Sequence, residues 1–243
     1  MQRLSIIYRL LPIGVFFLSS FSSNEIPSKH PTDFKAKAPA SKVDLDLQAE
    51  CIYEALNTNN LELPKLESFT KAVKGFYELK ERGLVQKEVL TLIDFSLSSN
   101  TKRLWVIDLA HNTILYHSLV AHGRNTGEEF ATNFSNAAES YKSSLGFYIT
   151  GEVYNGKHGK SLKLDGLEKG INDNARDRAV VMHGANYVSS TFIKNNKRLG
   201  RSLGCPAIPE ELKDEIIDAI KHQSCLFIYH PSQNLVSTSK LFY

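Results

Sequence analysis

The chain has 243 residues and a formal net charge of +3, from 29 basic and 26 acidic side chains. Hydrophobic residues make up 42% and charged residues 23%, a globular balance that excludes disorder over the whole chain. The small and dispersed positive charge argues against a nucleic-acid partner. Three cysteines are too few for a disulfide scaffold, and their odd number leaves at least one thiol unpaired. The length suits one large domain, or one medium domain with a smaller attachment.

The first 22 residues are typical of a secretory signal peptide. Arg3 and Arg9 precede an apolar run over residues 10–18, and serines follow it. The run is shorter than the roughly 20 residues of a membrane-spanning helix. We therefore expect cleavage, export to the periplasm or cell envelope, and no stable membrane span afterwards; the alternative is an uncleaved anchor. Residues 23–42 contain three prolines and are expected to form a flexible linker.

Residues 43–87 are expected to form a small helical region. Asp44 can cap a first helix, and Pro64 fits the first turn of a second helix with one apolar face. Gly83 fits the end of that helix. Because this region is too small to fold alone, we expect it to pack on the C-terminal part of the chain.

From residue 88 the pattern changes to that of strands, and it predicts a mainly β (α+β) catalytic domain with short helices over residues 88–232. A final helix is expected over residues 209–221, and residues 233–243 form a C-terminal tail. The expected strands cover residues 89–95, 104–109, 113–120, 146–150, 161–164, 179–183 and 225–229.

Cys205 is the thiol best placed to carry chemistry. Residues 200–207 read GRSLGCPA, a polar loop in which Gly204 lets backbone N–H groups approach a substrate. Such N–H groups can form an oxyanion hole. Cys51 and Cys225 lie in the apolar periods of a helix and a strand, so they are expected to be buried thiols or to pair with each other.

A cysteine nucleophile needs a base, and His183 is the best candidate. It ends an apolar strand, so its side chain is expected at the rim of the sheet. A zinc site that includes His183 and Cys205 is conceivable, but no CxxC, HxxxH or HxH spacing supports one. We therefore expect no metal and no cofactor.

These residues resemble the active-site signature of the L,D-transpeptidases of the YkuD fold, a His followed by Ser/Thr-x-Gly-Cys. The neighbouring segments are similar to one branch, the secreted bacterial murein L,D-transpeptidase catalytic domain proteins, over about residues 88–230. This chain departs from many members at Leu203 and Pro206, and 21 residues separate its His from its Cys. The similar segments are SSLGFY at 143–148, GKHG at 156–159, DGLE at 165–168, NDNA at 172–175, VMHGA at 181–185 and GRS at 200–202.

The resemblance implies a YkuD-like β-sandwich and a cysteine acyltransferase that acts on peptidoglycan stem peptides. Cys205 would form a thioester with one stem, and an amine of a second stem would then attack it to give a 3-3 cross-link. His183 would act as the base, and the Gly184 carbonyl is the candidate for orienting it. The backbone N–H groups of Gly204 and Cys205 would hold the oxyanion.

Further residues are expected at the substrate. Arg201 either binds a stem carboxylate or holds its loop through a salt bridge, and Ser202 either bonds within the loop or simply forms a turn. Tyr148, His158 and Gly184 are expected to line the cleft.

Two other functions remain open: an L,D-carboxypeptidase that hydrolyses the same acyl-enzyme, and a non-catalytic cell-wall binding module. A papain-like protease is disfavoured because its Cys usually precedes its His in the chain. We expect a monomer.

Overall fold

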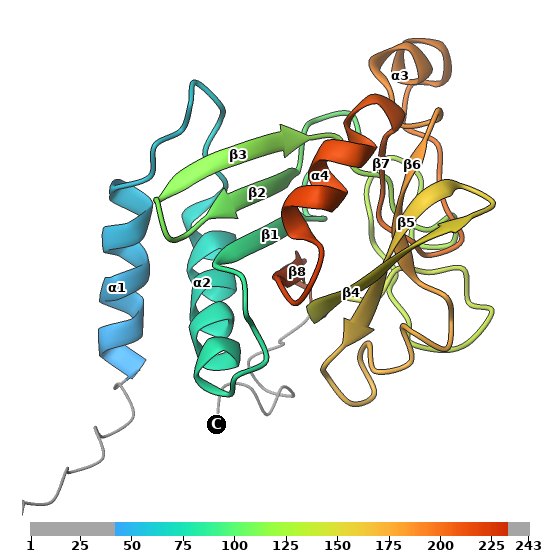
Figure 1. Ribbon diagram of the computed structural model, residues 1–243. Coiled ribbons are helices and arrows are strands. Elements are labelled where there is room, and N and C mark those ends of the chain that lie inside the picture. Colours follow the sequence, from blue (N-terminus) through green and yellow to red (C-terminus); the bar gives the residue numbers. More distant parts are fainter. Residues whose placement is uncertain (1–41, 233–243) are drawn as a thin grey trace, which may run out of the picture. The chain divides into compact units, whose positions relative to one another are not determined.

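The computed structural model describes residues 42–232, as four α-helices, one short 3-10 helix and eight strands (Figure 1). The predicted signal peptide, nearly all of the predicted linker and the predicted tail lie outside the described residues. The elements are α1 (Lys42–Glu54), α2 (Leu66–Glu81), β1 (Val89–Asp94), β2 (Leu104–Asp108), β3 (Thr113–Ser118), β4 (Gly146–Gly156), β5 (Gly159–Gly166), β6 (Val181–Ala185), α3 (Ser190–Asn196), β7 (Ala207–Pro209), η1 (Glu210–Leu212), α4 (Lys213–Ile220) and β8 (Cys225–Tyr229).

All eight strands belong to one sheet, in the order β3-β2-β1-β8-β4-β5-β6-β7. The β1–β8 and β6–β7 pairs are parallel, and the other pairs are antiparallel. The segment after β3 returns to the opposite end of the sheet, where Ala121 and Ala207 form an antiparallel bridge. The two ends of the sheet are therefore joined, and the sheet curls around an inner face. The mainly β, α+β class is confirmed.

Two short elements escaped the sequence pattern. The helix α3 has no buried residues, so no apolar period marks it. The strand β7 has three residues and ends at Pro209, which is too short for strand alternation to show. The helix α3 precedes the Cys205 loop in the chain, and β7 follows it.

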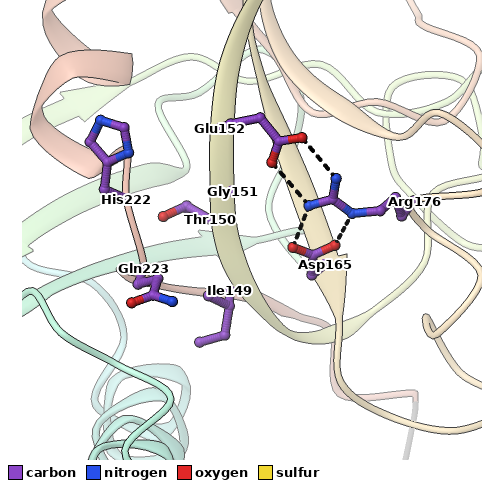
Figure 2. A pocket seen from close by; sticks show the side chains of 8 residues that line it. All are labelled: Ile149, Thr150, Gly151, Glu152, Asp165, Arg176, His222 and Gln223. Atoms are coloured by element: carbon purple, nitrogen blue, oxygen red, sulfur yellow. Dashed lines mark hydrogen bonds and ion pairs between the residues drawn. The ribbon is translucent and has the colours of Figure 1, made fainter.

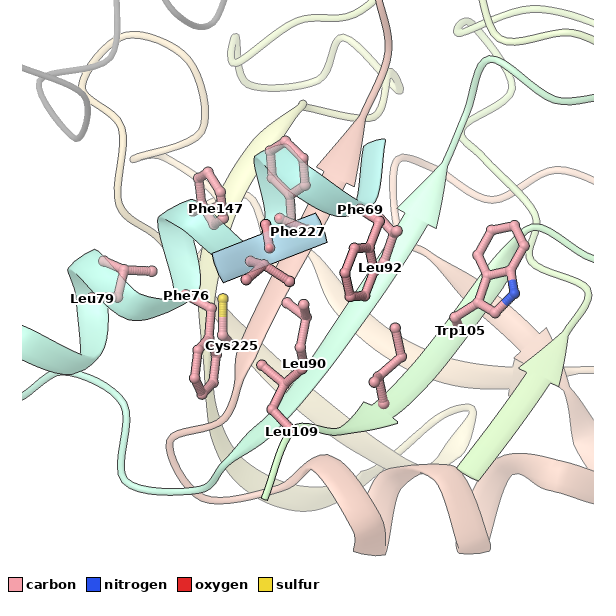
Figure 3. Close-up of a cluster of buried hydrophobic side chains, with 14 of the residues drawn as sticks. Phe69, Phe76, Leu79, Leu90, Leu92, Trp105, Leu109, Phe147, Cys225 and Phe227 are labelled. Carbon is pink, nitrogen blue, oxygen red and sulfur yellow. The ribbon is translucent and has the colours of Figure 1, made fainter. Parts of the chain in front are cut away.

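The outer face of the sheet carries the helical region. Phe69, Phe76 and Leu79 of α2 are fully buried against Leu90, Phe147 and Phe227 of the sheet (Figure 3). The rings of Phe147 and Phe227 stack with centroids 4.1 Å apart. The expectation that the helices pack on the sheet is confirmed, because one apolar cluster contains residues of both.

The inner face of the sheet forms a second core. Ile216, Ile217 and Ile220 of α4 are fully buried there, in one cluster with Leu162 of β5 and Met182 of β6. This packing holds the strands on which the site residues stand. α4 is the final helix that the apolar period predicted, although its first turn is the 3-10 helix η1.

Buried polar bonds fix the segment that leads into β6. The side-chain amide of Asn172 donates to the carbonyl oxygens of Leu145 and Phe147, each at 3.0 Å. The Glu168 carboxylate accepts the Phe147 N–H at 2.6 Å. The DGLE and NDNA segments therefore serve the fold, since buried carbonyl and N–H groups need partners.

The two cysteines outside the Gly-Cys loop do not pair with each other. Cys225 is fully buried in β8, as the apolar period of this strand predicts. Cys51 of α1 is exposed, so the expectation of a buried thiol is wrong for this residue. All three thiols of the chain are therefore free.

Candidate active site

Strand pairing brings the Cys205 loop to β6, the strand that carries His183. His183 in β6 lies opposite Ala207 in β7, two residues beyond Cys205. The Cys205 sulfur lies 3.5 Å from the backbone nitrogen of Val181, two residues before His183 on the same strand. The Cys205 thiol therefore lies against the backbone of β6, two residues from His183 along the strand.

His183 is held as a neutral base. Its side chain is 2% exposed, and its Nδ1 lies 2.8 Å from the Gly184 carbonyl oxygen. A carbonyl can only accept a hydrogen bond, so Nδ1 carries the proton and Nε2 keeps its lone pair. Burial lowers the pKa of His183, which favours the neutral ring. The Gly184 carbonyl thus occupies the orienting position that the family resemblance implies for it.

Cys205 is partly exposed, whereas His183 is buried. Its thiol points toward the Ala179 carbonyl oxygen at 3.7 Å. Loss of solvation raises the pKa of Cys205, against the smaller opposing effects of the Val181 N–H and the Arg178 charge. At rest, these shifts favour a neutral thiol at Cys205 and a neutral imidazole at His183.

Ser202 closes the loop that carries the cysteine. Its hydroxyl donates to the Cys205 carbonyl at 2.6 Å and accepts the Gly204 N–H at 3.0 Å. Gly204 has φ +125°, and a Cβ there would lie 2.9 Å from the Lys142 carbonyl oxygen, so only glycine fits. Of the two predicted oxyanion donors, the Gly204 N–H is bonded to Ser202. Within residues 42–232, the Cys205 N–H has no acceptor outside its own residue.

His158 belongs to the site. It lies in the turn between β4 and β5, and its ring stacks on the His183 ring with centroids 4.3 Å apart and planes at 18°. The side chain is exposed, so His158 forms the outer cover of the base.

Arg201 and Tyr148 are both engaged within the protein. The Arg201 guanidinium donates to the carbonyls of Arg124 and Gly127 and forms an ion pair with Glu128 at 2.6 Å, which is the loop-holding alternative. Tyr148, expected to line the cleft, lies instead in the inner core, fully buried, and its hydroxyl donates to the Ser144 carbonyl. Its position on the β4 face that turns inward explains the difference.

Two side chains near the nucleophile were not singled out from the sequence. Arg178 donates to four oxygens of the loop over residues 135–144, including the Lys142 carbonyl at 2.6 Å that lies against Gly204. Tyr187 packs on Gly200, and burial together with Cys205 raises the pKa of its hydroxyl to about 12. No local signal marks Tyr187, because only the fold brings it to Cys205.

A cavity of 440 Å³ lies elsewhere, beside the bulge of β4 (Figure 2). Arg176 pairs there with both Glu152 and Asp165, and Lys163 also pairs with Glu152, so each of these charges has an opposite partner. His222 and Gln223 also line the cavity, whereas His183 and Cys205 do not. We assign it no part in the chemistry.

Two further features are absent from the described residues. No group of three or more His, Cys, Asp or Glu side chains could hold a metal ion in this part of the chain. None of the helices within residues 42–232 is long and apolar enough to cross a membrane.

Comparison with known proteins identifies the class. The L,D-transpeptidase catalytic domain family matches residues 61–229, more than half of the chain. The chain therefore belongs to this family, whose enzymes act on the cell wall. No curated protein matches it.

Solved structures that resemble the chain are L,D-transpeptidases of low sequence identity. One from Mycobacterium smegmatis is 11% identical, with a TM-score of 0.37, and the match covers 59% of each chain. One from Mycobacterium tuberculosis is 12% identical, with a TM-score of 0.34, and covers 59% of this chain and 58% of that one. One from Xylanimonas cellulosilytica is 11% identical, with a TM-score of 0.34, and the match covers 76% of this chain and 92% of that one. The match spans about three fifths of the first of these structures.

Proposed function

We propose that the protein is a peptidoglycan L,D-transpeptidase that works through a thioester at Cys205. The observation that carries the proposal is the pairing of β6 with β7, which sets Cys205 beside a His183 whose Nδ1 bonds to Gly184. Such a pair, with the base oriented by a third group, supports nucleophilic catalysis. The family match supports the substrate class.

In the acylation step the Cys205 sulfur attacks the carbonyl carbon of the third residue of a donor stem. His183 Nε2 takes the thiol proton, and the Cys205 N–H supports the oxyanion. The C–N bond then breaks, and the proton passes from His183 to the leaving amine of the terminal D-residue. The energy of the peptide bond is kept in the thioester, so the reaction needs no cofactor.

In the second step an amine of another stem attacks the thioester, and the sulfur leaves with its proton restored through His183. A 3-3 cross-link forms. Attack by water instead would make the protein an L,D-carboxypeptidase with the same acyl-enzyme. A binding module has no use for the oriented base, so the site geometry supports an enzyme.

The proposal includes export. Peptidoglycan stems lie outside the cytoplasm, and residues 1–22 have the pattern of a signal peptide. We propose that the protein acts as a monomer in the periplasm or cell envelope.

The test is incubation of the purified protein with disaccharide-tetrapeptides, followed by mass spectrometry. An acyl adduct on Cys205 and a 3-3 dimer are expected; tripeptide without dimer would assign the carboxypeptidase instead. Cys205→Ala and His183→Ala should each lower turnover by about 10³-fold or more. Cys51→Ala removes an exposed thiol and should act like the unaltered protein. A chain with no adduct and no product would refute the proposal.

A further inference from the structure

The tip of the β4–β5 hairpin lies at the catalytic base. Gly156 and Gly159 pair at the end of the hairpin and leave Lys157 and His158 as the turn. Gly159 has φ +72°, as in a turn that closes with a glycine bulge. The strand β5 pairs with β6, which lies beside it in Figure 1. In this pair, Ser161 lies opposite His183. The turn is therefore held close to His183 by the sheet itself.

The stacked rings fix the turn more tightly. The His158 and His183 rings are stacked, with centroids 4.3 Å apart and planes at 18°. Lys157 precedes His158 in this two-residue turn, so its Cα lies about 3.8 Å from that of His158. His158 thus serves as a positioning residue that holds the lysine at the mouth of the site.

The other cations near the nucleophile are already used. Arg201 is bound by Glu128 and two carbonyl groups, and Arg178 by four oxygens. Lys157 is exposed, and within the described part of the chain no hydrogen bond or ion pair involves it. Its charge nevertheless acts on both His183 and Cys205. Lys157 is thus an exposed cation near His183 and Cys205 that is free to bind a ligand.

The donor stem of the proposed reaction carries a carboxylate close to the bond that breaks. The donor stem ends in a carboxylate on the Cα of the terminal D-residue, and this Cα lies about 3.8 Å from the Cα of the residue under attack. A residue that recognises this carboxylate must lie beside the nucleophile and base. We infer that Lys157 binds the terminal carboxylate of the donor stem, with His158 holding the hairpin tip in place. This inference rests on the proposed function.

The experiment compares two donors: a disaccharide-tetrapeptide with a free terminal carboxylate and the same compound as its terminal carboxamide. Acylation of Cys205 is followed by mass spectrometry, and kcat/KM is measured for each donor. Lys157→Gln should lower kcat/KM for the carboxylate donor by about 10- to 100-fold, the range of a charged hydrogen bond. It should change the value for the carboxamide by less than about twofold, so the preference for the carboxylate disappears.

Lys169→Gln is the matched control, because it removes the same charge from an exposed position that the structure places outside the site. It should keep the preference of the unaltered protein, and Lys157→Arg should keep most of it. If Lys157→Gln lowers both donors equally, or keeps the original ratio, the inference is wrong while the proposed function stands. If the unaltered protein forms no adduct with either donor, the proposed function fails, and this inference fails with it.

Discussion

The reactive residues form a neutral pair at rest. Burial lowers the pKa of His183 and raises the pKa of Cys205, so both shifts favour the neutral forms over an imidazolium–thiolate ion pair. The Gly184 carbonyl orients the ring without adding a negative charge. In the proposed reaction, the thiolate therefore forms only as His183 accepts the proton during attack.

This arrangement predicts the pH dependence of acylation. The reactive form needs neutral His183, present above its lowered pKa, and a protonated Cys205, present below its raised pKa. For donor acylation, kcat/KM should be level from below about pH 6.5 to above about pH 8.5, the ordinary values of the two groups. Alkylation by iodoacetamide, which needs thiolate, should still rise above about pH 8.5.

Both pH profiles are measured on the Cys51→Ala variant, so that the other exposed thiol does not contribute to the alkylation signal. An alkylation rate already maximal at about pH 6 would show a pre-formed ion pair and contradict the neutral one.

Ser202 should act on catalysis through the shape of its loop. Ser202→Ala removes the bonds to the Cys205 carbonyl and the Gly204 N–H. We expect kcat/KM to fall by about 10- to 100-fold and the free energy of unfolding to fall by about 1–3 kcal/mol. Ser224→Ala removes a buried hydroxyl bonded to the Ile220 carbonyl, away from the site, and should cost similar stability with unchanged kcat/KM. Equal kinetic losses in both variants would rule out the specific role of Ser202.

At the scale of the elements, the helix α2 meets the sheet most closely at Gly75. A Cβ at this position would overlap the tip of the Phe147 ring. That ring cannot move aside easily, because it is buried and stacks on Phe227. The glycine therefore sets how near the helix lies to the sheet.

Gly75→Ala should destabilise the protein although alanine is the better helix former by about 1 kcal/mol. We expect the overlap to cost about 1–3 kcal/mol in the free energy of unfolding. Denaturation followed by the fluorescence of Trp105, the single tryptophan and 2% exposed, measures the change. Combined with Phe147→Leu, the cost should be less than the sum of the two single costs. A more stable Gly75→Ala protein would show that the helix can move away.

At the scale of the whole molecule, one sheet separates two cores. α2 and part of α1 cover the outer face, while α4 fills the inner face under the catalytic strands. The family match begins at residue 61 and so includes α2. We propose that the helical region and the sheet form one folding unit, although the sequence suggested a catalytic domain that begins at residue 88.

A chain that starts at residue 88 should therefore fail to fold cooperatively. It would expose Leu90, Leu92 and Phe227 of the outer face, and a patch of this kind promotes aggregation. Thermal unfolding by circular dichroism checks this, with a chain that starts at residue 42 as the control. A cooperative transition of the shorter chain, at the midpoint of the control, would show that the sheet folds alone.

Local patterns were enough for seven of the eight strands and for the long helices, and they singled out a candidate nucleophile. Seven of the eight strands follow from alternation and apolar runs, because the side-chain period of a strand is visible over a few residues. The Gly-Cys loop and the strand-end histidine identify Cys205 and His183 as candidates. The sequence also suggested Arg201, Tyr148 and His158 at the cleft, but their residue types could not separate a ligand contact from a structural one.

The tertiary structure decided those assignments. The pairing of β5 with β6 brings His158 and Lys157 to the base, whereas Glu128 occupies Arg201 and the inward face of β4 buries Tyr148. Each outcome depends on contacts between segments far apart in the chain, and local periodicity carries no information about those contacts. The sequence by itself therefore predicted most of the elements and proposed the nucleophile and the base. Only the folded sheet decided which charges are neutralised and which one is left open at the site.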